Sequence, residues 1–267
     1  MDLIVPNSER TLRKSFRTQR RVMHALMMRE IITRFGRDNL GVLWLVVEPM
    51  IFTLGVATLW TTAGLSHATN IPPVAFAVTG YSSVLMWRNA ASHSSMAVEH
   101  NKTLLYHRGV MIIDVILTRI ALEVAGATCS FLVLSLIFGF LGWMPPPADL
   151  TLVMAGWLML AWFGASLALS IGAAVAYTRV IERLWIPIAY LMFPLSGAAY
   201  MVDWLPPRLQ SIVLYLPMVH GIELLRQGFF GNVVQTHHDM MYMSSCCLVL
   251  TLLGLWVIRE AAHRLEH

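Results

Sequence analysis

The sequence predicts an all-α membrane protein with six transmembrane helices, and two observations support this prediction. Hydrophobic residues make up 57% of the 267 residues and charged residues only 13%, whereas a soluble domain usually carries about a quarter charged residues. Six apolar stretches approach the roughly 20 residues that an α-helix needs to cross a bilayer. Membrane-spanning strands are not expected, because the stretches lack the alternation of barrel strands and open strand edges cannot be satisfied in lipid.

The stretches and the connections between them consume almost the entire chain, so we expect residues 1–267 to form a single transmembrane domain. The second stretch is the least regular, because Arg88 directly follows it. The stretches cover residues 40–65, 71–87, 120–143, 150–177, 184–202 and 240–258.

The lysines and arginines indicate how the stretches are oriented. Nine of the nineteen precede the first stretch, and the connections at residues 66–70 and 145–147 contain none. With connections alternating between the two sides, seventeen basic residues fall on one side and two on the other. Positively charged connections remain in the cytoplasm, so both termini are predicted to be cytoplasmic and the number of spans to be even.

Residues 10–34 have the pattern of an amphipathic helix at the cytoplasmic membrane surface. One helical face collects apolar side chains, and arginines surround it. Such a helix lies in the interface, where its arginines meet anionic headgroups; the alternative is a solvated basic tail. The apolar face consists of Leu12, Phe16, Met23, Met27 and Ile31.

Two connections are long enough to hold structure of their own. Residues 203–239 contain two apolar pieces, 209–216 and 218–230, separated by Pro217. Each is too short to span a bilayer, so we expect re-entrant or interfacial helices at the outer face. Residues 92–111 are polar, and we expect a short cytoplasmic helix over about 96–105.

The sequence lacks the common short motifs for nucleotide and metal chemistry. Neither lysine follows a glycine, so the phosphate-binding G-x-x-x-x-G-K-[ST] loop is missing, as are H-E-x-x-H and C-x-x-C. His237, His238 and Asp239 are metal-ligand types, but an exposed polar loop is the favoured interpretation. Because the basic residues cluster on one membrane side, the net charge of +4 does not indicate a nucleic-acid partner.

Charged residues inside apolar stretches are costly, by about 2.5–3.5 kcal/mol each. Glu48 precedes Pro49 in the first stretch; it either bonds a neighbouring segment near the cytoplasmic interface or shapes a pathway or gate. Arg119 and Glu123 are four residues apart, so they share a helix face and can neutralise each other. We expect that pair, together with Asp114, to be mainly structural.

Aromatic residues are frequent in or near the stretches. Most are expected to form an ordinary interfacial belt, but flat aromatic faces also stack on sugar rings, and composition does not separate the two roles. They are Trp60, Tyr81, Trp87, Trp185, Tyr190, Tyr200, Trp204 and Tyr215.

Three segments resemble one known family. REIITRFGRDNLGVLWLVVEP, from Arg29 to Pro49, resembles the membrane subunit of type-2 ABC exporters for bacterial polysaccharides, and is most similar to capsular polysaccharide export permeases of the KpsM type. NKTLLYHRGVMIIDVILTR, from Asn101 to Arg119, resembles the loop and third-helix entry of that family. LPMVHGIELLRQGFF, from Leu216 to Phe230, resembles its outer re-entrant segment.

The resemblance implies a homodimer in the bacterial inner membrane that works with a separate ATPase, which would hold ATP and Mg. This chain would bind no cofactor or metal and have no catalytic residue. A lipid-linked polysaccharide would pass through the dimer interface toward the periplasm, where a periplasmic or outer-membrane export partner is a further expectation. The implied ATPase-coupling residues are Arg20, Arg21, Arg29, Glu30, Arg34, Asn101, Lys102, Leu104 and Leu105. The implied pathway or gate residues are Glu48, Pro49, Trp44, Trp60, Tyr81, Trp185 and Tyr190, and the re-entrant segment carries Pro217, His220, Glu223 and Arg226.

Three alternatives remain at this level. The first is a permease of the same family whose cargo is O-antigen or teichoic acid instead of capsule. Less favoured is a proton-coupled secondary transporter using Glu48, Asp114 or Glu123, because the sequence lacks an inverted repeat. Equally disfavoured is a membrane-embedded transferase, for which residues 237–239 are the one weak candidate cluster.

Overall fold

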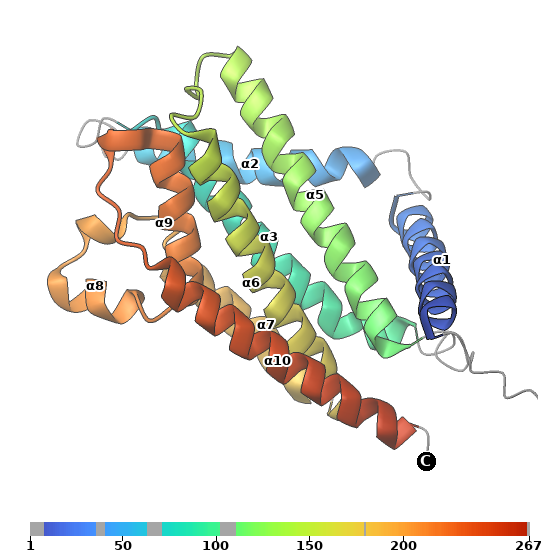
Figure 1. Cartoon of the computed structure of the whole chain (residues 1–267). Helices are drawn as coiled ribbons and strands as arrows, with labels where there is room; N and C mark the ends of the chain where they lie inside the picture. The colour runs from blue at the N-terminus through green and yellow to red at the C-terminus, as the bar shows by residue number, and fades with distance from the viewer. Residues whose placement is uncertain (1–7, 36–40, 63–70, 102–110, 179, 266–267) are drawn as a thin grey trace, which may run out of the picture.

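A computed structural model describes residues 8–35, 41–62, 71–101, 111–178 and 180–265, and in these ranges the chain is helical with no strand. The long helices at residues 73–100, 112–140, 150–177 and 240–265 run side by side in a bundle, the helix at residues 41–62 lies across it, and the short helices at residues 207–213 and 217–230 lie at one end (Figure 1). The α-helices are α1 (Ser8–Phe35), α2 (Gly41–Thr62), α3 (Pro73–His100), α5 (Ile112–Phe140), α6 (Leu150–Tyr177), α7 (Val180–Leu195), α8 (Pro207–Val213), α9 (Pro217–Phe230) and α10 (Met240–Leu265). Two short 3-10 turns, η2 (Val202–Trp204) and η3 (Gly231–Val233), flank α8 and α9.

The centre of the bundle is α6, which packs against α3, α9 and α10. Close backbone approach makes this possible. A Cβ atom on Gly156 would lie 2.7 Å from the Leu225 backbone nitrogen of α9, and one on Gly164 would lie 2.9 Å from Cα of Trp87 on α3. Small residues let helices approach in this way in membranes, where burial of apolar surface adds little to helix association. Trp87 fills the α3–α6 contact and is fully buried, so it is not the interfacial belt residue that its sequence position predicts.

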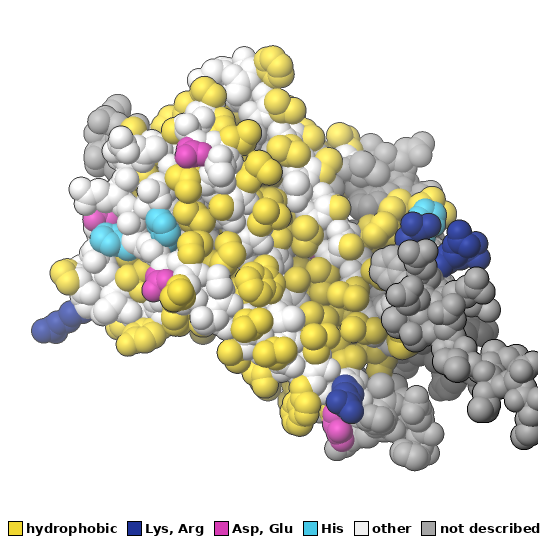
Figure 2. All heavy atoms as spheres, viewed as in Figure 1, with side chains coloured by type: hydrophobic (Ala, Val, Ile, Leu, Met, Phe, Trp, Pro, Cys, Tyr) yellow, Lys and Arg dark blue, Asp and Glu magenta, His cyan; other side chains and the backbone are white. Residues whose placement is uncertain are grey.

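Three of the described helices are long and apolar enough to cross a membrane: residues 112–140 of α5, 150–175 of α6 and 240–260 of α10. Hydrophobic side chains cover the face that these helices present (Figure 2). The all-α prediction is therefore confirmed for the described residues. The count of six spans stays a prediction, because α2, α3 and α7 do not meet the same length and composition criterion over their described residues.

Two predicted helix boundaries are wrong at the α3–α5 connection. Helix α3 continues through Arg88 to His100, so the described part of the short helix expected over 96–105 belongs to one long helix; residues 102–105 lie outside the described residues. Helix α5 begins at Ile112, eight residues before the predicted start at 120. Hydropathy ended both stretches at charged residues, but these charges have partners in the folded chain, as shown below.

The predicted fifth stretch also ends early. Helix α7 stops at Leu195, just after Pro194, and Gly197 adopts a positive φ of 84° that breaks the helix. The two apolar pieces that follow form α8 and α9, with Pro217 as the first residue of α9, a position that suits a residue without an N–H group. Helices α8 and α9 lie at the end of the bundle away from α1 (Figure 1).

Candidate functional site

The amino-terminal helix α1 docks on the adjoining ends of α3 and α5. Leu26 is buried against Ala97 of α3 and Val115 of α5, with Val22 packed alongside. The docking face is therefore centred on Leu26 and Val22, next to the apolar face that the sequence predicts. That predicted face is half-buried at Met23, Met27 and Ile31, and its placement at the membrane surface stays a prediction.

Polar contacts reinforce this docking at three points along α1. Gln19 donates a hydrogen bond of 2.9 Å to Asp114, which also accepts from the Met111 backbone N–H and so begins α5. Further along α1, Arg29 donates to the side chain of Asn101 at the end of α3. The third contact joins Glu30 to Arg119.

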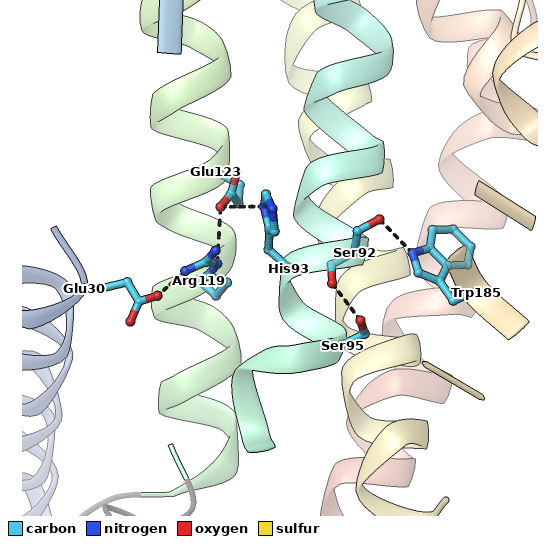
Figure 3. Close-up of polar contacts among 7 residues, drawn as sticks. All are labelled: Glu30, Ser92, His93, Ser95, Arg119, Glu123 and Trp185. Atoms are coloured by element: carbon cyan, nitrogen blue, oxygen red, sulfur yellow. Dashed lines mark hydrogen bonds and ion pairs between the residues drawn. The ribbon is translucent and has the colours of Figure 1, made fainter. Parts of the chain in front are cut away.

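Glu30, Arg119, Glu123 and His93 form a chain of charges from α1 through α5 to α3, which we call the coupling network (Figure 3). Arg119 pairs with Glu30, and its Nε lies 3.2 Å from Glu123 Oε1. On α3, His93 Nδ1 lies 2.9 Å from the same Glu123 oxygen. Among the described residues, neither of these two contacts has the geometry of a directed hydrogen bond, although both lie within ion-pair distance.

The coupling network explains how α5 tolerates charge in an apolar helix. Glu123 is only 4% exposed, and a buried carboxylate without a partner would be strongly disfavoured. The predicted Arg119–Glu123 pair is present, and it is one link in a longer chain that reaches α1 and α3.

Helix α3 is also joined to α7 at the level of the coupling network. Trp185 of α7 donates a hydrogen bond of 3.0 Å from Nε1 to Ser92 Oγ, and Ser95 donates to the Ser92 carbonyl at 2.6 Å (Figure 3). One turn away, the Arg88 guanidinium lies 5.8 Å from the ring centre of Tyr190, within cation–π range. Trp185 is buried, whereas Tyr190 is 65% exposed.

The aromatic residues between α2 and α3 stack in two groups. Phe52 stacks on Tyr81 with ring centres 3.8 Å apart. Nearer the α8–α9 end, Phe76 stacks between Trp60 at 4.5 Å and Trp204 at 5.4 Å. These rings hold α2 against α3 and bring the connection after α7 into the same cluster.

At the α8–α9 end, Arg226 of α9 is fully buried and holds the turn that ends α7. Its guanidinium donates to the carbonyls of Gly197 at 2.6 Å, Ala198 at 2.5 Å and Tyr200 at 2.7 Å, and it lies 3.7 Å from the Phe76 ring centre. The five donors of an arginine fork suit such multiple carbonyl contacts.

Glu223 and His220 extend this arrangement along α9. The Glu223 carboxylate accepts the backbone N–H of Val202 at 3.2 Å and of His237 at 3.0 Å. His220 accepts the backbone N–H of Asp239 at Nδ1, and its Nε2 lies 2.9 Å from the Leu214 carbonyl. One side of α9 therefore fixes the connections on both sides of it; we call His220, Glu223 and Arg226 the α9 anchor.

The candidate metal residues in the loop before α10 serve other contacts. Asp239 accepts the backbone N–H groups of Met241 and Tyr242 and so starts α10, while His237 lies 3.4 Å from Asp203. Burial and the neighbouring His220 lower the pKa of His238. Among the described residues, no group of three or more His, Cys, Asp or Glu side chains is arranged to hold a metal.

Both groups of contacts fall within a region of the sequence that matches a known family. The family model described as ABC-2 type transporter matches residues 21–230. The chain belongs to the ABC-2 type transporter family. In this ABC-2 chain the match runs from Arg21 in α1 to the end of α9, so it includes both the coupling network and the α9 anchor.

Several curated proteins resemble this ABC-2 chain over almost their whole length. The capsule polysaccharide export inner-membrane protein CtrC of Neisseria meningitidis serogroup A is 41% identical over 253 residues, 95% of this chain and 96% of that protein. BexB of Haemophilus influenzae, with the same description, is 37% identical over 256 residues, 96% and 97% of the two chains. The polysialic acid transport protein KpsM of Escherichia coli is 27% identical over 261 residues, 92% and 96% of the two chains.

The ABC-2 fold brings together some of the predicted site residues and separates others. Arg29, Glu30 and Asn101 meet at the α1 dock, whereas Arg20 and Arg21 are exposed. Of the predicted pathway residues, Tyr81, Trp185 and Pro49 are buried, Trp60 is half-buried, and Trp44 and Tyr190 are exposed. Lys102, Leu104 and Leu105, and the side chains of Arg34 and Glu48, lie outside what the structure describes.

Sequence reasoning did not select His93, Ser92, Gln19 or Phe76 of this ABC-2 chain. Only His93 could have been suggested from the sequence. Glu123 is an acidic residue inside an apolar stretch and therefore requires a polar partner, and the polar segment after Arg88 contains His93. Ser92, Gln19 and Phe76 acquire their roles through contacts with residues far along the chain.

Proposed function

We propose that this chain is the permease subunit of an ATP-driven exporter that moves lipid-anchored capsular polysaccharide across the bacterial inner membrane. The proposal is supported by membership in the ABC-2 family and by 37–41% identity to proteins described as capsule polysaccharide export inner-membrane proteins. The near-complete coverage on both sides means that no large part of those relatives lacks a counterpart here.

The observation that carries the proposal is the position of α1. One side of this helix is tied to α3 and α5 by Leu26 and the coupling network, while Arg17, Arg20 and Arg21 are exposed on its other side. A cytoplasmic ATPase that binds the exposed side would move α1, and the rigid contacts would pass that movement to two long helices. ATP and Mg would reside on that partner, and this chain would supply neither catalysis nor a nucleotide site.

The proposed assembly is a homodimer with six spans in each chain and both termini in the cytoplasm. Helices α2 and α7 support it, because each exposes large apolar side chains on the single chain: Leu43, Trp44 and Ile51 on α2, and Ile188, Tyr190 and Leu191 on α7. A second copy and the polymer pathway would cover these faces. Glu48 and Pro49 lie on the same α2 segment as Trp44, which fits the proposed gate.

The other candidate functions have less support. O-antigen and teichoic acid differ from capsule only in cargo, and the names of the relatives favour capsule. For a proton-coupled carrier, Asp114 and Glu123 are poorly placed, because Gln19 and Arg119 already engage them. For a transferase, His237 and Asp239 are held by contacts with the α9 anchor and the start of α10.

The first experiment is purification of the chain from its native host in mild detergent, followed by identification of bound proteins and an ATPase assay. We expect a stoichiometric ATP-binding subunit with vanadate-sensitive hydrolysis, and loss of surface capsule when the gene is deleted. A chain that purifies without an ATPase and whose deletion leaves surface polymer unchanged would refute the proposal.

A further inference from the structure

A deep apolar groove of about 630 Å³ lies between α5 and α6 near the α9 end of the bundle. Its floor is made of buried side chains, among them Phe131, Val153, Trp157 and Phe229. Its rims are exposed apolar side chains: Leu132, Leu136, Phe140, Met154 and Leu158. The groove is therefore hydrophobic from rim to floor, and Phe229 connects it to α9.

The polar atoms near the floor are already satisfied within the protein. Trp157 stacks on Phe131 with ring centres 4.5 Å apart, and its Nε1 donates to Thr128 Oγ1 at 2.9 Å. Thr128 in turn donates to the Val124 carbonyl at 2.7 Å. Ser135 Oγ is the lining hydroxyl for which the described residues provide no partner. One free hydroxyl cannot satisfy a sugar ring, so the lining excludes the polymer itself and favours an aliphatic chain.

The end of the groove is built from residues that suit contact with lipid. Pro145, Pro146 and Pro147 line it, and proline has no N–H that would remain unsatisfied in hydrocarbon. Gly139 lines the α5 side of the groove and leaves space there, since a Cβ at this position would meet only the Met144 carbonyl oxygen, 4.0 Å away. The next segment is tied to α9, since Asp149 N–H donates to the Gly228 carbonyl at 2.8 Å.

The surroundings of the groove indicate what fills it. Helices α5 and α6 are two of the three helices apolar enough to cross a membrane, so the groove opens on bilayer hydrocarbon, which holds no water to fill it. Figure 2 shows hydrophobic side chains over this face, while α2 and α7, the faces proposed for the second copy, pass behind it (Figure 1).

We propose that the α5–α6 groove is a binding site for one acyl chain of a membrane phospholipid, taken from the leaflet at the α9 end. The chain lies on the Phe131–Trp157 floor, contacts Phe229 and braces α5 against α6 and α9. The site depends on the membrane location of α5 and α6 but not on the cargo or on the ATPase.

The test is photolabelling of the purified full-length chain in phosphatidylethanolamine vesicles that contain a phosphatidylcholine with a diazirine at the end of one acyl chain. Adducts are mapped by peptide mass spectrometry. We expect them to concentrate on groove residues relative to Leu252 and Trp256, which are exposed apolar positions on α10. Since the vesicles contain no polymer or polymer anchor, labelling there identifies a phospholipid as the occupant.

Two substitutions at one position provide the matched control. Gly139→Leu should fill the groove and lower its labelling by about tenfold, because a few displaced methylene contacts suffice for that change. Gly139→Ala raises helix propensity about as much as Gly139→Leu does, but it adds only one methyl group to the groove. Its labelling should therefore stay within about twofold of the unsubstituted chain. Size-exclusion chromatography confirms that both variants are folded.

Two results would overturn the proposal. Equal labelling of α5, α6 and α10 would show ordinary contact with surrounding lipid instead of a site. Groove labelling that is absent in these vesicles, or unchanged in Gly139→Leu, would show that a phospholipid chain does not occupy it.

Discussion

Glu30 of α1 pairs with Arg119 of α5, so the amino-terminal helix is linked by charge to a residue 89 positions later in the chain. Arg119 also contacts Glu123, which is almost fully buried. The two contacts of Arg119 therefore serve different purposes: one docks α1, and the other neutralises a carboxylate inside the bundle.

This division predicts unequal effects of removing either partner of the pair. Glu30→Gln should loosen α1 and cost less than 1 kcal/mol of stability, as for partly exposed ion pairs. Arg119→Gln should cost about 3 kcal/mol, because it removes the arginine that pairs with the buried Glu123 carboxylate. Thermal unfolding of the purified variants measures both. The double variant Arg119→Gln/Glu123→Gln should recover most of the loss; equal loss in the single and double variants would contradict this account.

The exposed side of α1 is predicted to bind the ATPase. Reversal of charge in Arg20→Glu/Arg21→Glu should weaken co-purification of the ATPase or association with the membrane surface, because these arginines are exposed and face away from the dock. The control is Arg208→Glu, an exposed arginine in α8 at the other end of the bundle. Unchanged assembly and activity in the double reversal would refute the proposed placement of α1.

Arg226 is predicted to be essential for the end of the bundle formed by α8 and α9. Arg226→Met removes the donors to three carbonyls and should cost about 3–5 kcal/mol, as for other broken buried charge contacts. Arg226→Lys should recover only part of it, because an ammonium cannot reproduce the fork. Surface polymer and the amount of folded chain in the membrane are measured together. Normal stability in Arg226→Met would show that these carbonyls find other donors.

Two glycines offer a matched test of the helix packing. Gly156→Ala should destabilise the chain by about 1–3 kcal/mol, because its Cβ would enter the α9 backbone at Leu225. Gly139→Ala on α5, where a Cβ would meet only the Met144 carbonyl oxygen at 4.0 Å, should be neutral or stabilising by up to about 1 kcal/mol. The two variants are compared by their unfolding midpoints. Equal midpoints would mean that α6 and α9 move apart to accommodate the methyl group without loss of stability.

The buried and exposed aromatic residues of α7 are predicted to differ in function. Trp185→Phe removes the hydrogen bond to Ser92 and should cost about 1 kcal/mol of stability. Tyr190→Ala should leave stability nearly unchanged, because the ring is largely exposed, yet reduce export if this face lines the pathway. Polymer export per folded chain is the measurement. Normal export in Tyr190→Ala would remove this residue from the proposed pathway set.

The amino-acid sequence was enough to predict a helical membrane protein, a basic amphipathic helix over residues 10–34 and two short helices on either side of Pro217. These features depend on local composition and periodicity, which the chain carries wherever it folds. The predicted Arg119–Glu123 pair was correct for the same reason, since residues four apart meet on any helix.

The ends of the helices and the pairing of the charges depend on contacts between helices that are far apart in the chain. The hydropathy pattern ended the second predicted span before Arg88 and began the third at residue 120. A charged residue lowers the hydropathy of a segment even when the folded chain provides a partner for it. Tyr190 supplies that partner for Arg88, and Glu30 and His93 complete the environment of Arg119 and Glu123. Each partner lies on a different helix, so no local pattern could reveal it. The packing of α6 against α3 and α9 brings the helices to the distances at which those contacts form.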